Sequence, residues 1–312
     1  MCKFEVVNKD DDAMRFLKQS GDMVPNDSPK FLLHRLLSDY QDARSLEHVH
    51  ASELTKEGGI CARLYGLVDL TKTAALPTWL TTSQAVTYEL GHLLEARIIN
   101  WYADIGAATT NWQCMACGTI TEFSTRPKDC HGCGCTGFKP DNYRFESSKT
   151  GISCGIDLLL SLPKKDKLTV LEIKTIAPDE FKALAAPLAE HRLRTNLYLR
   201  CIAESAEARA KLVDTTEAFI LYVTKGGFGV KDEFIKAWGL HDGFSPFKEF
   251  KIKRQDKDTE DLIAPAIKVK HFRQGLIGLP GPICSTALGK RAQDCHLRKA
   301  CFSGDWPPGT PK

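Results

Sequence analysis

Three charged residues interrupt two apolar runs within residues 151–176, GISCGIDLLLSLPKKDKLTVLEIKTI. The polar stretch PKKD between the runs indicates a turn, so this segment is expected to form a β-hairpin. Asp157 interrupts the first run, and Glu172 and Lys174, which should share one strand face, interrupt the second. Isolated charges are costly in an apolar sheet. The hairpin is therefore predicted either to bind a hard divalent cation and a phosphate oxygen or to hold a simple salt bridge.

These residues resemble the core of the PD-(D/E)XK nucleases, with Asp157 as the D and Glu172-Ile173-Lys174 as the E-X-K. The resemblance implies an α/β fold of the restriction-endonuclease type, a mixed sheet flanked by helices. It also implies that Asp157, Glu172 and the backbone carbonyl of Ile173 bind Mg²⁺ or Mn²⁺, which prefer oxygen ligands. Lys174 would then orient the attacking water or help to deprotonate it.

A helix predicted from about residue 82 to about residue 102 contains the stretch GHLLEARIINWY. Gly91 and Glu95 are four residues apart and share one helical face. Nucleases of the RecB and lambda exonuclease type often carry G-x-x-x-E on the helix before the hairpin, so the resemblance adds Glu95 to the catalytic metal site. His92 is expected to be a packing or surface residue. The alternative for Glu95 is a local surface pair, for example with Arg97.

Residues 179–205, after the hairpin, are predicted to be helical. RecB-type nucleases often carry Q-x-x-x-Y on this helix; here Tyr198 fits the tyrosine, and Arg194 stands at the glutamine position. Arg194 and Tyr198 are therefore expected to support the site and to contact DNA, since arginine can also hold phosphate. The alternative is an ordinary surface helix. Residues 219–224 and 247–252 are predicted to add strands to the sheet.

Two C-x2-C pairs lie in the polar segment before the hairpin, twelve residues apart: Cys114 with Cys117, and Cys130 with Cys133. Four thiolates at this spacing suit a tetrahedral structural zinc, so a Zn²⁺ ribbon inserted into the nuclease core is predicted. Cys135 could replace Cys133 as the fourth ligand. A redox pair or unliganded thiols are the other interpretations. The ribbon could contact DNA or another protein.

A second group of cysteines resembles the [4Fe–4S] ligands of the AddB helicase-nucleases and the CRISPR-associated RecB-like exonucleases, in which one upstream cysteine joins three near the C-terminus. The residues in that order are Cys61, Cys284, Cys295 and Cys301. The last spacing matches these families, whereas the ten residues before Cys295 exceed their usual two. His296 could substitute for a cysteine. Zinc at the same thiols, or simple burial, are the alternatives.

Composition bounds the class of protein. The chain has 312 residues and a net charge of +3, with no apolar run long enough to span a membrane and no apolar signal core at its start, so a cytoplasmic protein of a bacterium or a phage-infected host is expected. Twelve cysteines without an export signal favour metal ligation. Residues 248–299 hold 12 Lys or Arg against 6 acids, which suits a phosphate backbone. The apolar stripe after Asp27-Ser28-Pro29 is expected to be a core helix.

Four segments are predicted: 1–110, the N-terminal helical part; 111–139, the zinc ribbon; 140–255, the nuclease core; and 256–312, the closing segment. The resemblance implies a divalent-metal-dependent exonuclease acting on DNA ends in recombination, repair or replication, with other proteins of those processes as partners. The compact size and the lack of a helicase segment suit a stand-alone, phage-encoded enzyme. The alternative is a non-catalytic zinc and DNA-binding module, or a docking subunit, on a nuclease scaffold.

Overall fold

The computed structural model of the chain describes residues 46–56, 58–72, 78–226 and 245–303, and five isolated positions, Leu33, Leu36, Leu37, Gln41 and Asp42. Most of the helix predicted after Asp27 therefore lies outside the described residues. Leu33 and Leu36 are exposed, so the expectation that this stripe packs in a core is wrong at these two positions.

The chain divides into two compact units. The smaller comprises residues 1–44 and 75–90, and the larger comprises residues 45–74 and 91–312. In the smaller unit, strand β1 (Gln41–Asp42) pairs antiparallel with β3 (Thr78–Trp79). Helix α5 (Thr82–Asp104) has the predicted extent and gives its residues from Gly91 onward to the larger unit.

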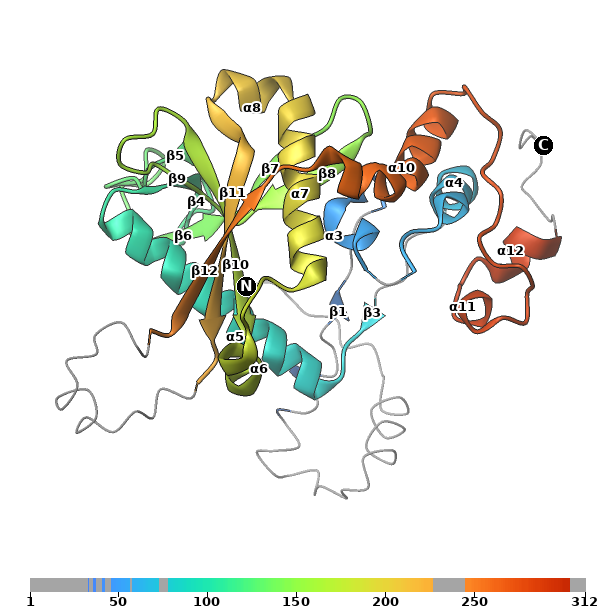
Figure 1. Cartoon of the computed structure of the whole chain (residues 1–312), viewed down its shortest axis with the longest axis horizontal. Helices are drawn as coiled ribbons and strands as arrows, with labels where there is room; N and C mark the ends of the chain where they lie inside the picture. Colours follow the sequence, from blue (N-terminus) through green and yellow to red (C-terminus); the bar gives the residue numbers. More distant parts are fainter. Residues whose placement is uncertain are drawn as a thin grey trace. The chain divides into compact units, whose positions relative to one another are not determined.

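A seven-stranded sheet forms the centre of the larger unit (Figure 1). Its strands in order are β12 (Phe247–Lys253), β11 (Val213–Thr224), β10 (Leu168–Ile176), β9 (Leu158–Leu160), β4 (Ala108–Cys114) and β5 (Ile120–Ser124), with β6 (Phe138–Asp141) also paired to β4. Strands β9 and β10 form the predicted antiparallel hairpin, with Leu160 opposite Thr169. Strand β11 runs parallel to β10, and β12 runs antiparallel to β11. The sheet is therefore mixed.

The parallel connection from β10 to β11 passes through three helices: α6 (Pro178–Ala183), α7 (Ala189–Glu204) and α8 (Ala206–Ala210). The single helix predicted over residues 179–205 is thus wrong, because the chain leaves the helical conformation between α6 and α7. Pro187 lies in this break. Proline has no backbone N–H to donate and disfavours the helical conformation of the preceding residue, which accounts for the break.

Helices cover both faces of the sheet. Val170 belongs to an apolar cluster that includes Leu197 and Ile202 of α7, whereas Leu171 belongs to a second cluster that includes Ile98 of α5. Consecutive side chains of a strand point to opposite faces, so α7 packs on one face and α5 packs on the other (Figure 1). The predicted fold class, a mixed sheet flanked by helices, is confirmed.

A second, three-stranded sheet joins β2 (Val49–His50), β8 (Ile152–Ile156) and β7 (Tyr143–Glu146). Helices α3 (Ala51–Leu54) and α4 (Ala62–Thr71) flank the predicted break at the two glycines 58 and 59. Helix α10 packs against α4. The elements after the main sheet are η1 (Asp256–Thr259), α10 (Glu260–Arg273), α11 (Lys290–Gln293) and α12 (Arg298–Ser303).

The cysteine-rich segment continues the main sheet. Strand β4 pairs with β5 and β6 to make the ribbon, while Ala108 and Thr109, at its start, pair with β9. The ribbon is therefore attached by backbone hydrogen bonds to the hairpin that carries the charged residues. No helix of the described residues combines the length and the apolar character needed to cross a bilayer.

Candidate active site and cysteine clusters

Asp157 lies where the chain leaves the small sheet and enters the main one, between β8 and β9. Its side chain is buried, and its Oδ2 accepts a hydrogen bond of 2.8 Å from the backbone N–H of Ile173 on β10. This bond is possible because the short β9–β10 pairing ends just before the carboxylate, leaving the N–H of Ile173 for a side-chain acceptor. The position of Asp157 relative to β10 is thereby fixed.

Glu172 and Lys174 lie side by side on β10, as predicted. The Nζ of Lys174 pairs with Oε1 of Glu172, lies 3.7 Å from Oδ2 of Asp157, and donates a hydrogen bond of 3.0 Å to the carbonyl of Ile173. The Glu172 residue is only 1% exposed. The two carboxylates singled out in the sequence, Asp157 and Glu172, therefore lie around the Lys174 ammonium in a largely buried site.

Glu95 joins this group electrostatically from α5. Burial, followed by the negative charge of Asp157, raises the pKa of Glu95 to about 8, against the opposing effect of Lys174. A Cβ atom added at Gly91 would lie 3.4 Å from Oγ1 of Thr175, so this glycine lets α5 approach β10 one turn before Glu95. The side chain of the neighbouring His92 is 70% exposed, so of the two predicted alternatives, packing and surface, it is a surface residue.

One oxygen of the site has no partner among the described residues. Oε2 of Glu172 is buried and accepts no hydrogen bond among the described residues. Burial, followed by the charge of Asp157, raises the pKa of Glu172 to about 7 despite its pairing with Lys174. A buried carboxylate oxygen without a partner is unfavourable. A divalent cation would satisfy it, and a set of carboxylates and a backbone carbonyl is the set of donors that Mg²⁺ and Mn²⁺ prefer.

The carboxylate oxygens are spread around Lys174 and do not converge on one metal position. Among the described residues, only the four ribbon cysteines place three or more ligand atoms within 4.8 Å of one another. The Lys174 ammonium itself lies between Glu172 and Asp157. Burial acts to lower the pKa of Lys174, but the charges of Glu172 and Asp157 outweigh it and raise this pKa. Lys174 is therefore a cation.

Helix α7 covers the charged group with polar side chains. Burial and the charges of Glu172 and Asp157 raise the pKa of Tyr198 well above its usual value, so its hydroxyl stays protonated. Arg194 pairs with Glu190 and donates a hydrogen bond of 3.3 Å to Oγ1 of Thr55. The Arg194 charge also acts on Glu172. Both predicted supporting residues therefore lie within electrostatic reach of the carboxylates.

Two further residues near the site have no signal in the sequence. Asn142 donates a side-chain hydrogen bond to Glu95. The hydroxyl of Tyr222, on β11, lies 2.8 Å from Nδ1 of His191 and accepts a hydrogen bond from the N–H of Leu188. Burial, followed by the charges of Lys174 and Arg194, lowers the pKa of His191 to about 4 and keeps it neutral. These contacts depend on long-range packing, which no local pattern indicates.

The ribbon cysteines form a compact group of four. The Sγ atoms of Cys114 and Cys133 are 3.6 Å apart, as are those of Cys117 and Cys130. Tetrahedral zinc with Zn–S bonds of about 2.3 Å requires sulfur–sulfur distances of about 3.8 Å. The geometry thus fits zinc and selects Cys133. Cys135 instead accepts a hydrogen bond from the N–H of Gly137.

The second cysteine group is also brought together, but more widely. Burial raises the pKa of Cys295, and the negative charges of Cys61, Cys301 and Cys284 raise it further, so all four lie close enough to interact. No three of their sulfur atoms are within 4.8 Å of one another, in contrast to the ribbon group. This wider spacing leaves more room than a single tetrahedral zinc requires.

Arginines attach the closing segment independently of its cysteines. Arg63 donates hydrogen bonds to the carbonyls of Pro280 (3.0 Å) and Cys301 (3.4 Å). Arg291 donates to the carbonyls of Gly58 (2.5 Å) and Gly59 (2.8 Å), in the segment just before Cys61. These four bonds hold the C-terminal cysteines near Cys61 even without a metal.

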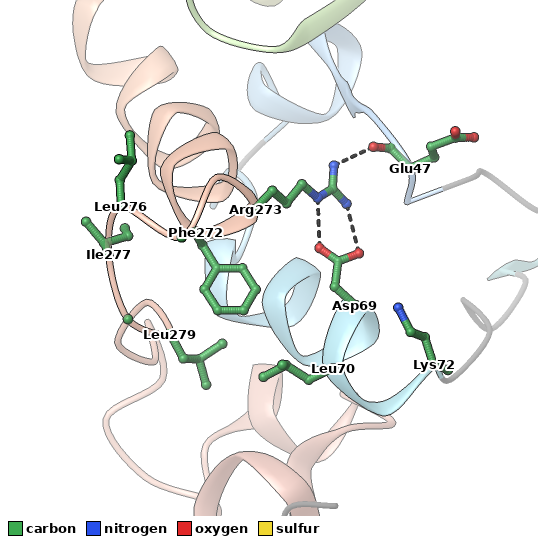
Figure 2. A pocket seen from close by; sticks show the side chains of 11 residues that line it. Glu47, Asp69, Leu70, Lys72, Phe272, Arg273, Leu276, Ile277 and Leu279 are labelled. Atoms are coloured by element: carbon green, nitrogen blue, oxygen red, sulfur yellow. Dashed lines mark hydrogen bonds and ion pairs between the residues drawn. The ribbon is translucent and has the colours of Figure 1, made fainter. Parts of the chain in front are cut away.

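A cavity of about 960 Å³ lies beside the end of α4 and is lined by none of the site residues described above. Figure 2 shows Arg273 pointing to both carboxylate oxygens of Asp69 and to the backbone oxygen of Glu47. Phe272 and Leu279 lie on the apolar side of this cavity. The arginine therefore joins the end of α10 to α4, which is a structural role.

Comparison with known proteins gave structural similarities only. No protein-family model matches the sequence, and no curated protein matches it. The solved structure of LHK-Exo in complex with dAMP has a TM-score of 0.40 at 12% identity, covering 74% of this chain and 89% of that chain. An alkaline exonuclease (LHK-Exo) from Laribacter hongkongensis has a TM-score of 0.38 at 14% identity, covering 74% and 88%. A phage-related exonuclease from Haemophilus somnus has a TM-score of 0.35 at 16% identity, covering 74% and 96%. These scores are low, and the similarities do not establish a function.

The raised pKa of Glu95 makes a prediction for stability. Because this pKa is about 8 in the folded chain against an ordinary value of 4.5, the metal-free protein binds protons more readily when folded, and its stability falls as pH rises toward and through 8. Glu95→Gln removes this effect. Between about pH 6 and pH 9, the free energy of unfolding without divalent ions should fall by about 2–3 kcal/mol more in wild type than in Glu95→Gln, as measured by urea unfolding. Parallel curves for the two proteins would contradict the assigned environment of Glu95.

Proposed function

We propose that this chain is a divalent-metal-dependent deoxyribonuclease that hydrolyses phosphodiester bonds as an exonuclease at DNA ends. The observation that carries the proposal is the buried oxygen of Glu172, which lacks a partner among the described residues, in a site shared with Asp157, Glu95 and the Lys174 ammonium. A purely structural salt bridge would need one acid for one base. Once deprotonated, three carboxylates around one ammonium leave excess negative charge, which a divalent cation would balance.

Asp157 and Glu172 would hold Mg²⁺ or Mn²⁺ with the carbonyl of Ile173, and Glu95 would complete the set. When bound, such a cation lowers the pKa of water and offsets the charge of the scissile phosphate. The hydrogen bond from the N–H of Ile173 holds Asp157 in place for this role. Metal binding requires deprotonated carboxylates, so it would have to displace protons from Glu95 and Glu172, whose pKa values are raised.

The side chains around the carboxylates have distinct roles in the proposed reaction. Lys174, whose pKa is raised, is a cation and so would orient the attacking water or hold a phosphate oxygen, and would not act as a base. Tyr198 stays protonated and can donate a hydrogen bond. Arg194 adds positive charge near the site. These groups favour a phosphodiester, which carries one negative charge, over a neutral substrate.

The two cysteine groups support a RecB-like nuclease of the AddB or CRISPR-associated type. In this proposal Cys114, Cys117, Cys130 and Cys133 bind structural Zn²⁺, and Cys61, Cys284, Cys295 and Cys301 bind a [4Fe–4S] cluster that links the closing segment to α4. The order of the four cysteines along the chain supports the cluster, and Cys61, Cys301 and Cys284 act electrostatically on Cys295. Action in DNA recombination, repair or replication, in the cytoplasm of a bacterium or a phage-infected cell, fits such an enzyme.

Cleavage of end-labelled single- and double-stranded DNA with Mg²⁺, Mn²⁺ or chelator tests the nuclease. Asp157→Asn and Lys174→Met should each lower the rate by about 10²-fold or more, because each removes a charged group at the reacting phosphate. Glu217→Gln is the matched control, since that carboxylate forms ion pairs with Lys165 and Lys251 away from the site. Wild-type rates in both site variants would refute the assigned site. DNA binding without cleavage by the wild-type chain would favour the non-catalytic alternative.

Zinc content tests the ribbon. Cys130→Ala should lose one zinc per chain and lower the melting temperature, because the ribbon then lacks a closed four-thiolate site. Cys135→Ala should keep the zinc, since its sulfur lies outside the group of four. Elemental analysis of the two purified variants makes the comparison. Loss of zinc in the Cys135 variant alone would show that the ligand set is wrong.

Iron and sulfide content tests the second group. Anaerobically purified protein should be brown and contain about four irons per chain. Cys295→Ala should lose colour and iron, whereas Cys154→Ala, which changes a buried cysteine outside the group, should keep both. A colourless protein with two zincs per chain would assign zinc to both groups.

A further inference from the structure

A cavity of about 460 Å³ opens beside the C-terminal part of α5, over β11 and β12. Its lining includes Trp101, Tyr102, Leu221, Phe247 and Glu249. This volume is in the range of small-molecule sites in proteins. It suits a single flat group such as a nucleobase, and is too small for the end of a duplex.

The walls of this cavity present aromatic surface to solvent. Trp101 is 46% exposed and Phe247 is 37% exposed, although both are large apolar side chains. The guanidinium of Arg97 lies over the ring of Trp101, 5.3 Å from its centroid. Exposed aromatic side chains next to an arginine are the elements with which proteins bind single-stranded nucleic acid, since bases stack on the rings and the cation attracts the backbone.

The polar groups of the cavity suit a base better than a phosphate. Glu249 is the only charged residue among the described residues that line it and is negative, so it repels a phosphate. Its carboxylate can accept a hydrogen bond from an N–H group of a base. Burial and the charge of Glu249 raise the pKa of Tyr102, so its hydroxyl stays protonated. The pocket therefore offers one acceptor and one donor between aromatic walls.

The cavity lies along α5 from Glu95 of the candidate active site. Ile98 and Tyr102 follow Glu95 by three and seven residues, so all three lie along one face of α5. Leu221, in the cavity wall, pairs in the sheet with Ile173, the residue between Glu172 and Lys174. Seven residues of helix span about 10 Å, which is the length of a few nucleotides.

We propose that this pocket binds one unpaired base of the DNA strand held at the carboxylate site, a few nucleotides from the phosphate that is cut. The base stacks on Trp101, its N–H edge faces Glu249, and Arg97 lies beside the adjoining backbone. The proposal depends on the proposed nuclease function for the placement of the strand. Under this proposal, the DNA that occupies the carboxylate site is an unpaired strand.

The test uses single-stranded oligonucleotides that carry 2-aminopurine at one position each, moved stepwise from the end. Fluorescence of this base falls when it stacks on an aromatic ring. The protein is the full chain with Asp157→Asn, so that DNA is bound and not cut. We expect quenching at one or two adjacent positions. Adding Trp101→Ala should abolish this local quenching and weaken oligonucleotide binding between about 5-fold and about 100-fold.

Two variants control for loss of structure. Trp101→Phe keeps an aromatic ring and should restore part of the quenching. Tyr88→Ala removes an aromatic side chain of similar exposure, 48%, from the same helix outside the pocket, and should leave quenching unchanged. Circular dichroism and thermal unfolding check that each variant is folded.

The outcomes separate this proposal from the proposed function. Three results would overturn the proposed base-binding pocket, even in an active nuclease: equal quenching at all positions, no quenching, or quenching that Trp101→Ala leaves unchanged. Of these, no quenching at all would indicate that the pocket binds a peptide or another ligand. If wild type does not cut DNA, the proposed function fails. Local quenching that depends on Trp101 would still support a base-binding pocket in that case.

Discussion

The short antiparallel pairing of β9 with β10 is the interaction on which the candidate site depends. It brings Asp157 next to Glu172 and Lys174, which are distant from it in sequence, and it ends where the N–H of Ile173 can bind the Asp157 carboxylate. A shift of this pairing by one residue would turn the charged side chains to the other face of the sheet. The core packing on both faces, by α5 and α7, keeps the register fixed.

The same arrangement is unfavourable without a cation. Burial and mutual repulsion raise the pKa values of Glu95 and Glu172, and one oxygen of Glu172 lacks a partner among the described residues. Such cost in a folded protein is typical of functional sites, where ionisable groups are arranged for a ligand and not for stability alone. Lys174 offsets only part of the excess charge. Under the proposed function, a divalent cation offsets the remainder.

Local patterns in the sequence predicted the features that depend on spacing along the chain. The hairpin, the Glu95 helix and the two C-x2-C pairs could be found because each needs only a few neighbouring residues. Features that depend on long-range packing could not. The pairing of β4 with β9, the hydrogen bond from Asn142 to Glu95, and the contact of Tyr222 with His191 all join segments far apart in sequence. The break between α6 and α7 had a local signal, Pro187. The sequence nevertheless predicts one continuous helix, because apolar residues at helical spacing lie on both sides of this proline.

Direct titration with Mn²⁺ tests the central claim that three buried carboxylates and a carbonyl form a cation site. Calorimetry on the zinc-loaded chain at about pH 8, where Glu172 has largely lost its proton, should give one saturable Mn²⁺ site per chain. Glu172→Gln should lose this site while keeping the fold. Unchanged Mn²⁺ binding by Glu172→Gln, or no binding by the wild-type chain, would contradict the account.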